Sequence, residues 1–480
     1  MKNLFKLLVW ITSLTMLSTW GSNAYAAACA SVTGNWGTAG TWSCGHVPVA
    51  GDTVTITLGT TVTLNVNTNV LASLTVNGTL ITLAGSSADL YIGGNIVNNG
   101  IINMQFSTGT NTIYLAGANI TSTFSGTGTW LLDNLDLNGK NPNACTGACK
   151  VELSGSPNLQ FINANLFAGN SATFTLNALG NSTATVTFSR AGNQTVATTG
   201  VTYPNLVLGG TSNKTPNAGT INVLGSLTVS SGVTWVGSTN NPTSNISGDL
   251  IIAGTFTAGS GTTSVAGNFT NSGTFTASTG TVVLNGTAAQ TVGGITTTTF
   301  NNLTVANTGA GSTTLLLNTS VVGNLSVNSG TLDLGAFTAN RTAAGGTITV
   351  ANGATLMIGG TNSFPTNYTT HTIGATSTVV YNGTNQSVAA EAAPGYGYLT
   401  LSGSGTKTAA GSFIIRSDLT IASGVDMPRL ALDAILGRPL PAQVEYRPLL
   451  MVRYLTEILV DEQTRVDEQM PVDEALPVLV

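Results

Sequence analysis

The stretch that decides the fold is Gly-Asn-Gln-Thr-Val at residues 192–196, because its glutamine returns twice at a fixed spacing. Ala-Gln-Thr-Val follows at 289–292 and Asn-Gln-Ser-Val at 385–388, so Gln194, Gln290 and Gln386 are 96 residues apart. Self-similarity at a fixed period is the sequence signature of a repeat architecture. The rest of the chain is interpreted against this repeat.

Short apolar phrases flank each glutamine in the same order. Val-Thr-Phe at 186–188, Val-Val-Leu at 282–284 and Val-Val-Tyr at 379–381 precede it, and a Ser-Gly pair closes each match at 231–232, 329–330 and 423–424. β-branched residues between polar turns predict strands. The predicted segments are a signal peptide (1–26), a cap with the first rungs (27–85), a degenerate repeat (86–182), units 183–278 and 279–374, a truncated unit (375–424) and a tail (425–480).

A shorter echo lies inside the long unit. Gly-Asp-Leu-Ile-Ile-Ala-Gly-Thr-Phe-Thr at 248–257 is followed 19 residues later by Gly-Asn-Phe-Thr-Asn-Ser-Gly-Thr-Phe-Thr at 267–276. This spacing suits one rung of a right-handed parallel β-helix, a β-solenoid, with five rungs in each 96-residue unit. A string of immunoglobulin-like sandwiches would explain the long period but gives the inner echo no role.

Composition agrees with an ordered all-β chain that carries little charge. Only 7% of residues are charged, 58 are glycine and 42% are hydrophobic, whereas disordered chains are charged and poorly hydrophobic. Residues 27–425 hold seven basic and nine acidic side chains, spread along the sequence. A phosphate backbone needs clustered Lys and Arg, so we expect no nucleic-acid partner.

The segment from Met1 to Ala26 has the three parts of a secretory signal. Lys2 and Lys6 precede an apolar stretch at 7–17, and Ala-Tyr-Ala ends at a cleavage site after Ala26. The apolar stretch is shorter than the roughly 18–20 residues of a membrane span. We therefore expect an extracellular, outer-surface or periplasmic protein whose mature chain has no transmembrane segment; lipidation of Cys29 is a minor alternative.

Export makes the four cysteines candidates for disulfides. The sequence-local pairing joins Cys29 to Cys44 and Cys145 to Cys149, one of three possible pairings. The alternative is a metal site made by Cys29, Cys44 and His46. Disulfides are favoured because neither pair has the Cys-x-x-Cys spacing of zinc sites.

The segment after the signal carries a resemblance to a known family. Asn35-Trp36 is followed by Thr-Trp-Ser-Cys-Gly-His-Val-Pro at 41–48, Gly-Asp-Thr-Val-Thr-Ile at 51–56 and alternating strands at 59–64 and 74–80. Over roughly the first 50 residues after the signal, this resembles the domain named for its eight glycines, found on exported bacterial β-repeat proteins. The resemblance implies the start of a β-helix and no catalytic residue. Trp36 and Trp42 are expected to cover its open end.

The repeat pattern stops at Gly424, and a different composition follows. Residues 425–480 contain six of the 14 prolines, a stretch with helical spacing at 447–463 and a six-residue acidic repeat. We predict a partly helical or disordered acidic tail. It is either an interaction segment or the product of a disrupted reading frame.

Catalytic chemistry has little support in the sequence. Carboxylates are far apart, Asp133 and Asp136 form the closest pair, and residues three apart in a strand face opposite sides. We interpret the carboxylates as solvated turn residues and expect no catalytic residue and no cofactor. His46 and His371 have no serine-histidine-aspartate grouping around them.

The function that fits best is structural or adhesive. A neutral, Thr- and Asn-rich repeat suits multivalent contact with glycans, matrix or other cells, and the whole resembles bacterial adhesin and autotransporter-passenger β-helices. An outer-membrane translocator or a pilus system would be its partner. The alternatives are a polysaccharide-active β-helix enzyme, a lyase or hydrolase, and a pilus-associated exported protein.

Overall fold

The computed structural model describes residues 26–426, except 84, 106–110, 119, 137–148, 162–165, 168–173, 179–182, 310, 392 and 423–424. The predicted signal peptide up to residue 25 and the tail from 427 therefore lie outside the described residues. The chain divides into unit 1, which ends at Thr304, and unit 2, which begins at Val305. This division falls within the second sequence repeat.

The described chain is an all-β parallel solenoid of about 16 turns with about 22 residues per turn, which confirms the predicted fold class. The two helices among the described residues are single 3-10 turns, η1 (Ala39–Thr41) and η2 (Gly237–Thr239). Within the described chain, no helix has the length and apolar character that a bilayer crossing requires. Right-handed coiling remains the expectation for parallel strands joined by crossovers.

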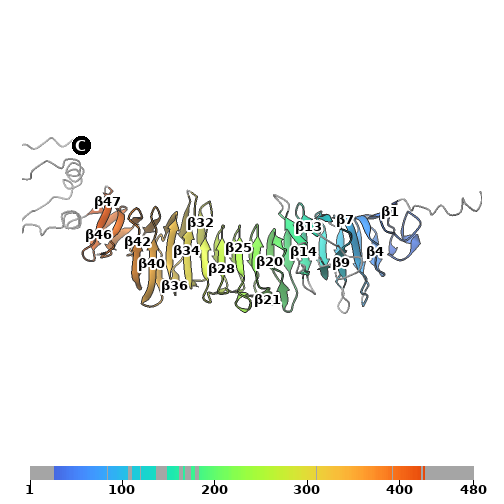
Figure 1. Cartoon of the computed structure of the whole chain (residues 1–480), viewed down its shortest axis with the longest axis horizontal. Coiled ribbons are helices and arrows are strands. Elements are labelled where there is room, and N and C mark those ends of the chain that lie inside the picture. Colours follow the sequence, from blue (N-terminus) through green and yellow to red (C-terminus); the bar gives the residue numbers. More distant parts are fainter. Residues whose placement is uncertain are drawn as a thin grey trace, which may run out of the picture. The chain divides into compact units, whose positions relative to one another are not determined.

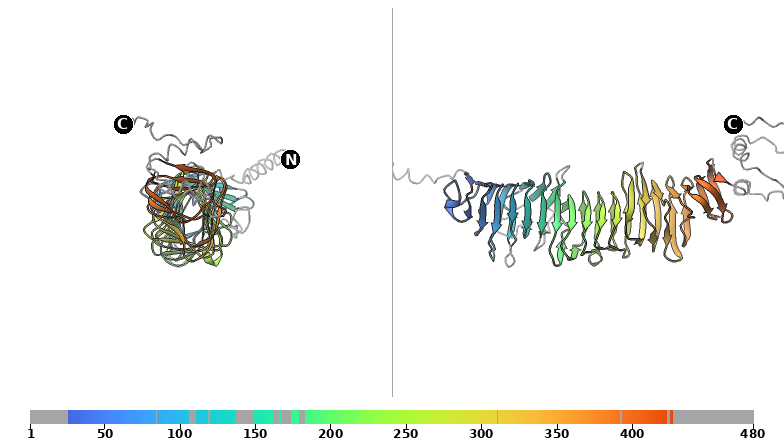
Figure 2. Two further views of the ribbon diagram at one scale, coloured as in Figure 1. Left: turned by 90° about the vertical axis from the view of Figure 1, so that its left-hand side faces the viewer. Right: turned by 180° about the vertical axis from the view of Figure 1, so that it is seen from behind.

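The longest sheet of unit 1 has one strand from each turn, paired in parallel (Figure 1). Its strands are β2 (Gly34–Asn35), β4 (Thr61–Leu64), β6 (Thr79–Thr82), β8 (Ile101–Asn103), β11 (Thr129–Leu132), β14 (Asn158–Phe161), β17 (Thr185–Phe188), β20 (Asn205–Leu208), β23 (Leu227–Val229), β26 (Leu250–Ile252), β29 (Phe269–Asn271) and β32 (Gln290–Gly294). Figure 2 shows the same succession from behind.

Two further sides of unit 1 are formed by shorter sheets. In the earlier turns they are built from β1 (Ala28–Ala30), β3 (Thr53–Ile56), β5 (Leu71–Val76), β7 (Leu90–Asn98), β9 (Thr112–Leu115), β10 (Thr121–Ser125), β12 (Asn134–Asp136), β13 (Cys149–Leu153), β15 (Leu166–Phe167) and β16 (Phe174–Ala178). Later, one side has β18 (Gln194–Val196), β21 (Ser212–Pro216), β24 (Val233–Val236), β27 (Thr255–Thr257) and β30 (Thr274–Thr276). The other has β19 (Thr202–Tyr203), β22 (Thr220–Val223), β25 (Thr243–Ile246), β28 (Thr262–Val265) and β31 (Thr281–Leu284).

Unit 2 is built in the same way from parallel strands. β33 (Thr298–Phe300) precedes the division and β34 (Asn302–Ala306) lies across it. Unit 2 then has β35 (Ser312–Leu315), β36 (Thr319–Val321), β37 (Leu325–Ser329), β38 (Thr331–Asp333), β39 (Ala339–Arg341), β40 (Gly345–Val350), β41 (Thr355–Ile358), β42 (Tyr368–Ile373), β43 (Thr378–Tyr381), β44 (Thr384–Val388), β45 (Tyr396–Leu401), β46 (Ser404–Ala409), β47 (Ile415–Ile421) and β48 (Val425–Asp426).

The core of unit 1 is a ladder of side chains that repeats once per turn. Strand residues alternate between inside and outside, so parallel pairing in register stacks each inward residue on its counterpart in the next turn. Eleven fully buried residues form one such column. They are Val62, Leu80, Ile102, Trp130, Leu159, Val186, Leu206, Leu227, Leu250, Phe269 and Val292.

Turn length varies along this column and corrects the predicted 19-residue rung. Val62 pairs with Leu80 across a short turn, whereas Trp130 pairs with Leu159 across a much longer one. The predicted spacing occurs between Leu250 and Phe269, the turn that carries the sequence echo. The inward strands keep register while the loops between them absorb the extra residues.

The 96-residue repeat is also not a whole number of turns. From β17, which contains Thr185, four pairings along the sheet lead to β29. The residue 96 positions after Thr185 is Thr281, and it lies in β31, two strands after β29 in the chain. β31 belongs to a different sheet from β17. The prediction of five rungs per unit is therefore wrong, and equivalent sequence phrases occupy different sides of the solenoid.

Glycine precedes the inward residue in successive turns where the backbones of neighbouring turns approach closely. A Cβ atom at Gly267 would lie 2.5 Å from the carbonyl carbon of Gly248, and one at Gly248 would lie 2.6 Å from that of Gly225. Real Cβ atoms do not approach backbone this closely, so larger residues would push the turns apart. This explains the glycine two residues before the apolar position in successive turns.

Candidate functional site at the amino-terminal turn

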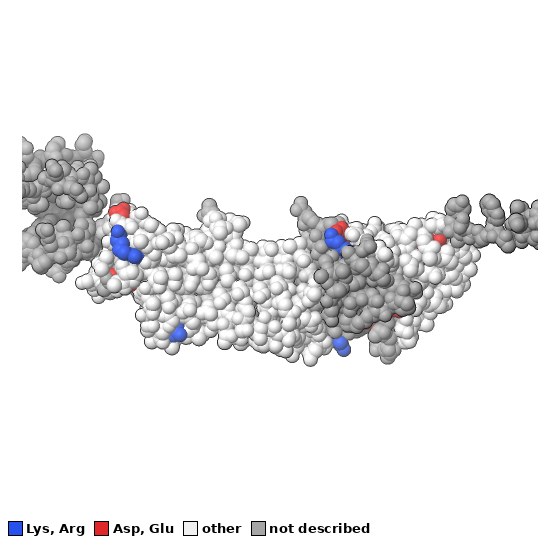
Figure 3. Space-filling view, in the orientation of Figure 1, with Lys and Arg blue, Asp and Glu red and all other residues white. Residues whose placement is uncertain are grey.

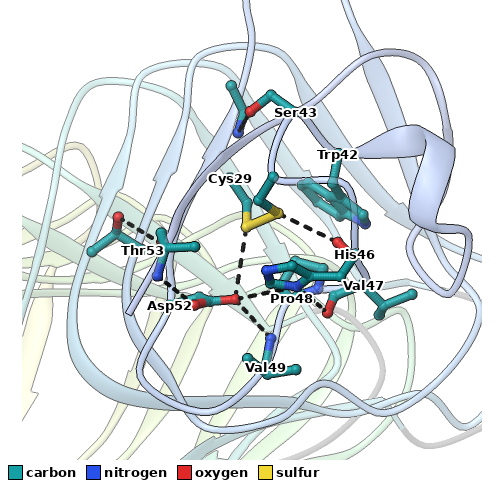
Figure 4. Close-up of a disulfide and its surroundings, with 12 residues drawn as sticks. Cys29, Trp42, Ser43, His46, Val47, Pro48, Val49, Asp52 and Thr53 are labelled. Carbon is teal, nitrogen blue, oxygen red and sulfur yellow. Dashed lines mark hydrogen bonds and ion pairs between the residues drawn. A yellow bond between two sulfur atoms is a disulfide. The ribbon is translucent and has the colours of Figure 1, made fainter. Parts of the chain in front are cut away.

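The first described turn contains a group of side chains able to form a disulfide or to bind a metal (Figure 4). Cys29 lies in β1, which pairs with β3, and Cys44 follows η1. The two form a disulfide that closes a loop with a sequence separation of 15. The predicted pairing of Cys29 with Cys44 is confirmed, and it ties the beginning of the solenoid to its first turn.

Asp52 lies next to this disulfide and is fully buried. Its Oδ1 accepts the Ala27 N–H at 2.7 Å, and its Oδ2 accepts the Val49 N–H at 2.9 Å. Oδ2 is also 3.7 Å from the Cys29 sulfur. A buried carboxylate is stable when it accepts backbone hydrogen bonds of this kind. Asp52 therefore holds two segments of the turn together.

His46 completes the group from the loop after Cys44. Its Nδ1 lies 3.0 Å from the Val47 carbonyl oxygen and 3.8 Å from Asp52 Oδ2. A carbonyl oxygen can only accept, so Nδ1 is the donor in this hydrogen bond. The His46 side chain is 44% exposed, so the group opens to solvent on this side.

The two predicted capping tryptophans pack beside this group. Trp36 and Trp42 are buried, with an edge-to-face contact and ring centroids 4.8 Å apart. The Trp42 Nε1–H donates to the Trp36 carbonyl oxygen at 2.8 Å. The two tryptophans are thus buried against each other in the first turn.

The positions of these side chains also bear on the alternative prediction of a metal site. Ligand atoms of Cys29, Cys44 and His46 lie within 4.8 Å of one another. In the disulfide state neither sulfur is a thiolate, and thiolate is the form of cysteine that binds metals. The disulfide and the alternative metal site thus use the same cluster of residues. In the oxidised state the disulfide excludes metal binding.

The other predicted site residues lie apart from this group. Cys149 is buried and disulfide-bonded, while Cys145 lies outside the described residues. Ala26, the predicted cleavage position, is exposed. Asp133 is buried and its Oδ2 accepts the Asn111 N–H at 3.0 Å; burial raises the pKa of this carboxyl, and the hydrogen bond opposes that shift. Asp136 lies at the end of β12.

The interpretation of the carboxylates as solvated turn residues is wrong for Asp52, Asp133 and Glu391, which are all buried. The physical reason is that these carboxylates have partners inside the fold: Asp52 and Asp133 accept backbone N–H groups of turns, and Glu391 contacts the His371 ring. Sequence spacing gives no sign of this. The Gly-Asp at 51–52 belongs to the family motif, but nothing in that motif marks Asp52 as a buried acceptor.

A second pair, in unit 2, was not identified from the sequence. His371 Nδ1 lies 2.7 Å from Glu391 Oε1, and His371 Nε2 lies 3.1 Å from the Tyr368 carbonyl oxygen. Both partners are acceptors, so the protonated imidazole can donate to both from its two ring nitrogens. The hydrogen bond to Glu391 is the main cause that raises the pKa of His371. The two residues are close to one turn apart in sequence, and that spacing is the signal the sequence offers.

Comparison with protein families gives one match. A family model described as the G8 domain matches residues 41–163. The match begins within the group described above and extends well beyond the segment that carries the sequence resemblance, into the predicted degenerate repeat. Comparison with characterised proteins and with solved structures finds no match. A β-solenoid with a G8 match is compatible with a structural or extracellular protein.

Proposed function

We propose that the protein is exported and acts at the cell surface as an adhesive β-solenoid, making many weak contacts with glycans, matrix or other cells. The observation that carries this proposal is a set of outward threonines stacked in register on consecutive turns. Multivalent contact through repeated weak sites raises avidity without a strong single site. The proposal includes a signal peptide cleaved after Ala26.

The threonine array lies on the sheet formed by β24, β27 and β30. Thr234 pairs with Thr255, Thr255 with Thr274, and Thr257 with Thr276. These side chains are half-buried or exposed. Neighbouring strands are about 4.8 Å apart, so the hydroxyls repeat at a spacing set by the backbone. A glycan lying along the turns would meet the same donor and acceptor groups at each step.

The surface charge supports contact through neutral polar groups. Figure 3 shows charged side chains few and scattered on the face in view. Long-range attraction between a charged patch and a charged ligand requires clustered charge. A neutral surface instead favours uncharged hydroxyl-rich ligands. The disulfide between Cys29 and Cys44 supports export, because disulfides persist in oxidising compartments.

The experiment is binding of the full mature chain to a glycan array and to immobilised matrix proteins. Thr255→Val with Thr274→Val removes two stacked hydroxyls while keeping β-branched side chains. The matched control is Thr262→Val with Thr281→Val, an in-register pair with the same sequence spacing on a neighbouring sheet. We expect the first variant to bind glycans more weakly and the second to bind as the wild type does.

Three results would contradict the proposal. Absence of binding at the highest soluble concentration, with the chain shown to be folded by circular dichroism, would remove the adhesive function. Release of reducing sugars or unsaturated products from a polysaccharide, abolished by Asp133→Asn or Asp136→Asn, would favour the polysaccharide-active enzyme. Co-purification with pilus subunits from the producing cells would favour a pilus-associated protein.

A further inference from the structure

We infer that the amino-terminal cluster is a redox-controlled metal site: when the Cys29–Cys44 disulfide is reduced, the two thiolates, His46 and Asp52 bind a zinc ion. This inference is independent of the proposed adhesive function. It assigns a second state to residues that form a disulfide in the structure.

The first support is the convergence of soft ligands. Two cysteine sulfurs and a histidine nitrogen lie within 4.8 Å of one another. Zinc in proteins is most often held by four cysteine and histidine ligands, with carboxylate oxygen as a further choice. Cys29 and Cys44 come from β1 and from the loop after η1, so the fold rather than local sequence brings them together. The Cys-x-x-Cys criterion applies to ligands that are close in sequence and misses such a cluster.

The second support is the position of the carboxylate. Asp52 Oδ2 is 3.7 Å from the Cys29 sulfur. In a tetrahedral zinc site, bonds of about 2.1 Å to oxygen and 2.3 Å to sulfur place these two ligand atoms roughly 3.6 Å apart. Asp52 is held in this position by the Ala27 and Val49 N–H groups. Asp52 is therefore held at a zinc ligand's distance from the Cys29 sulfur before a metal arrives.

The third support is the state of the histidine. Ligating histidines usually donate the hydrogen of their other ring nitrogen to a carbonyl or carboxylate, which fixes the tautomer. His46 Nδ1 already donates to the Val47 carbonyl oxygen, so the neutral imidazole would ligate through Nε2. The partly exposed imidazole also gives the metal a path from solvent, since the His46 side chain is 44% exposed.

The change of state begins with reduction of the Cys29–Cys44 disulfide to two thiols. A water-soluble phosphine breaks the S–S bond, supplies two electrons and becomes the phosphine oxide by taking the oxygen of one water, whose two protons end on the sulfurs. Zinc then displaces these two protons as it binds the thiolates. A disulfide oxidant such as oxidised glutathione re-forms the Cys29–Cys44 bond by exchange, is itself reduced to two thiols, and leaves the zinc without its sulfur ligands. The cluster thus holds either a covalent bond or an ion, and never both.

The test uses the full mature chain with Cys145→Ser and Cys149→Ser, so that the second cysteine pair binds no metal. The protein is reduced with the phosphine, desalted without oxygen and titrated with Co²⁺, then with Zn²⁺. We expect near-ultraviolet thiolate-to-cobalt absorption at one equivalent, displaced by Zn²⁺. The oxidised protein should show neither.

A histidine substitution provides the matched comparison. His46→Gln should weaken zinc binding by at least about tenfold, the scale on which groups at metal sites alter affinity. His371→Gln, the same substitution far from the cysteines in sequence, should leave the affinity unchanged. Asp52→Asn should also weaken zinc binding. Equal affinity in the His46 and His371 variants, or equal metal binding by the oxidised protein, would overturn the site.

A second measurement needs no further substitution and so does not depend on a variant that folds. In the reduced chain that carries Cys145→Ser and Cys149→Ser, the rates at which iodoacetamide alkylates Cys29 and Cys44 are followed by mass spectrometry with and without Zn²⁺. We expect zinc to slow both reactions at least about tenfold, because ligated thiolates are poor nucleophiles. Rates that zinc leaves unchanged would overturn the inference.

Discussion

At the scale of single residues, the three glutamines that define the repeat share one structural role. Gln194 and Gln290 accept the backbone N–H four residues before them with Oε1, and Gln386 accepts that of Gly383, three residues before. The side-chain amide of each donates to carbonyl oxygens of an earlier turn. All three are buried. The recurring phrase is thus a turn held by its own side chain.

Replacing one of these glutamines should be costly. Gln290→Leu leaves the Gly286 N–H without its acceptor and removes the amide donor to the Gly267 carbonyl oxygen, while the Val265 carbonyl oxygen keeps the Asn285 N–H. Each buried polar group left unpaired costs about 1–3 kcal/mol, so we expect a loss of roughly 2–4 kcal/mol. Urea unfolding followed by circular dichroism measures it. Asn285→Leu, an exposed amide in the same turn, is the control and should stay within about 0.5 kcal/mol.

The His371–Glu391 pair predicts a pH dependence. The pKa of His371 is raised in the folded chain, so the pair contributes its full stability below the ordinary histidine pKa and loses it as pH rises through the raised value. We expect the urea midpoint of the wild type to fall between pH 6 and 8. Removing the charge-assisted hydrogen bond with His371→Gln should cost roughly 1.5–3 kcal/mol at pH 6.

Other titrating groups limit the pH range over which this test reports on His371. Burial raises the pKa of Tyr381 to about 12, so this tyrosine beside Glu391 does not titrate in the range. Burial lowers the pKa of Lys214 to about 8, which adds a stability gain as pH increases beyond that point. The measurement therefore ends at pH 8. A midpoint in His371→Gln that falls as steeply as in the wild type would contradict the assignment.

At the scale of elements, the strands were predictable and their stacking was not. Alternation at Val54, Ile56, Val62 and Leu64 is a local property, and all four are buried. Turn length depends on loops that point outward, where insertions have little energetic consequence. The short step from Val62 to Leu80 and longer steps elsewhere therefore leave no periodic signal, and the sequence echo represents one short region.

The candidate site shows the same limit. Spacing and compartment predict the pairing of Cys29 with Cys44, and the alternative prediction is a metal site made by these two residues and His46. The buried carboxylate of Asp52 was missed because its role depends on two N–H groups that only the folded turn brings to it. The His371–Glu391 contact likewise depends on which side chains of two adjacent turns point toward each other.

Loss of the Cys29–Cys44 disulfide should affect the first turn more than the rest. A loop of about 15 residues loses roughly 3 kcal/mol of stabilisation when its cross-link is removed. In a solenoid each turn contacts only its neighbours, so the effect is local. We expect Cys29→Ser with Cys44→Ser to speed amide hydrogen exchange in β1 and β3 and to leave β23 and β26 unchanged, as measured by mass spectrometry.

The other cysteine pair supplies the comparison. Cys145→Ser with Cys149→Ser opens no loop in the first turn, so exchange in β1 and β3 should match the wild type. Acceleration of β1 by both double variants to the same degree would show that the terminal turn does not depend on its own disulfide.

At the scale of the whole molecule, stability is distributed along columns rather than concentrated in one centre. The column from Val62 to Val292 in unit 1 has its own counterpart in unit 2, where Leu332, Leu356, Val379 and Leu399 are paired in register and buried. In the second half of unit 1 an aromatic column, Trp235, Phe256 and Phe275, stacks with centroids 5.9 Å apart at each step. Each contact links a turn to the next one only.

This organisation makes unfolding local, and a cavity should reveal it. Leu250→Ala in β26 removes a fully buried side chain and should cost about 2–5 kcal/mol. Because Leu250 pairs with Leu227 and Phe269, we expect faster hydrogen exchange in β23, β26 and β29, decreasing with each turn away. Leu399→Ala in unit 2 should give the same pattern around β43, β45 and β47. Uniform acceleration throughout the described chain in either variant would instead show one cooperative unit, and the column view of stability would be wrong.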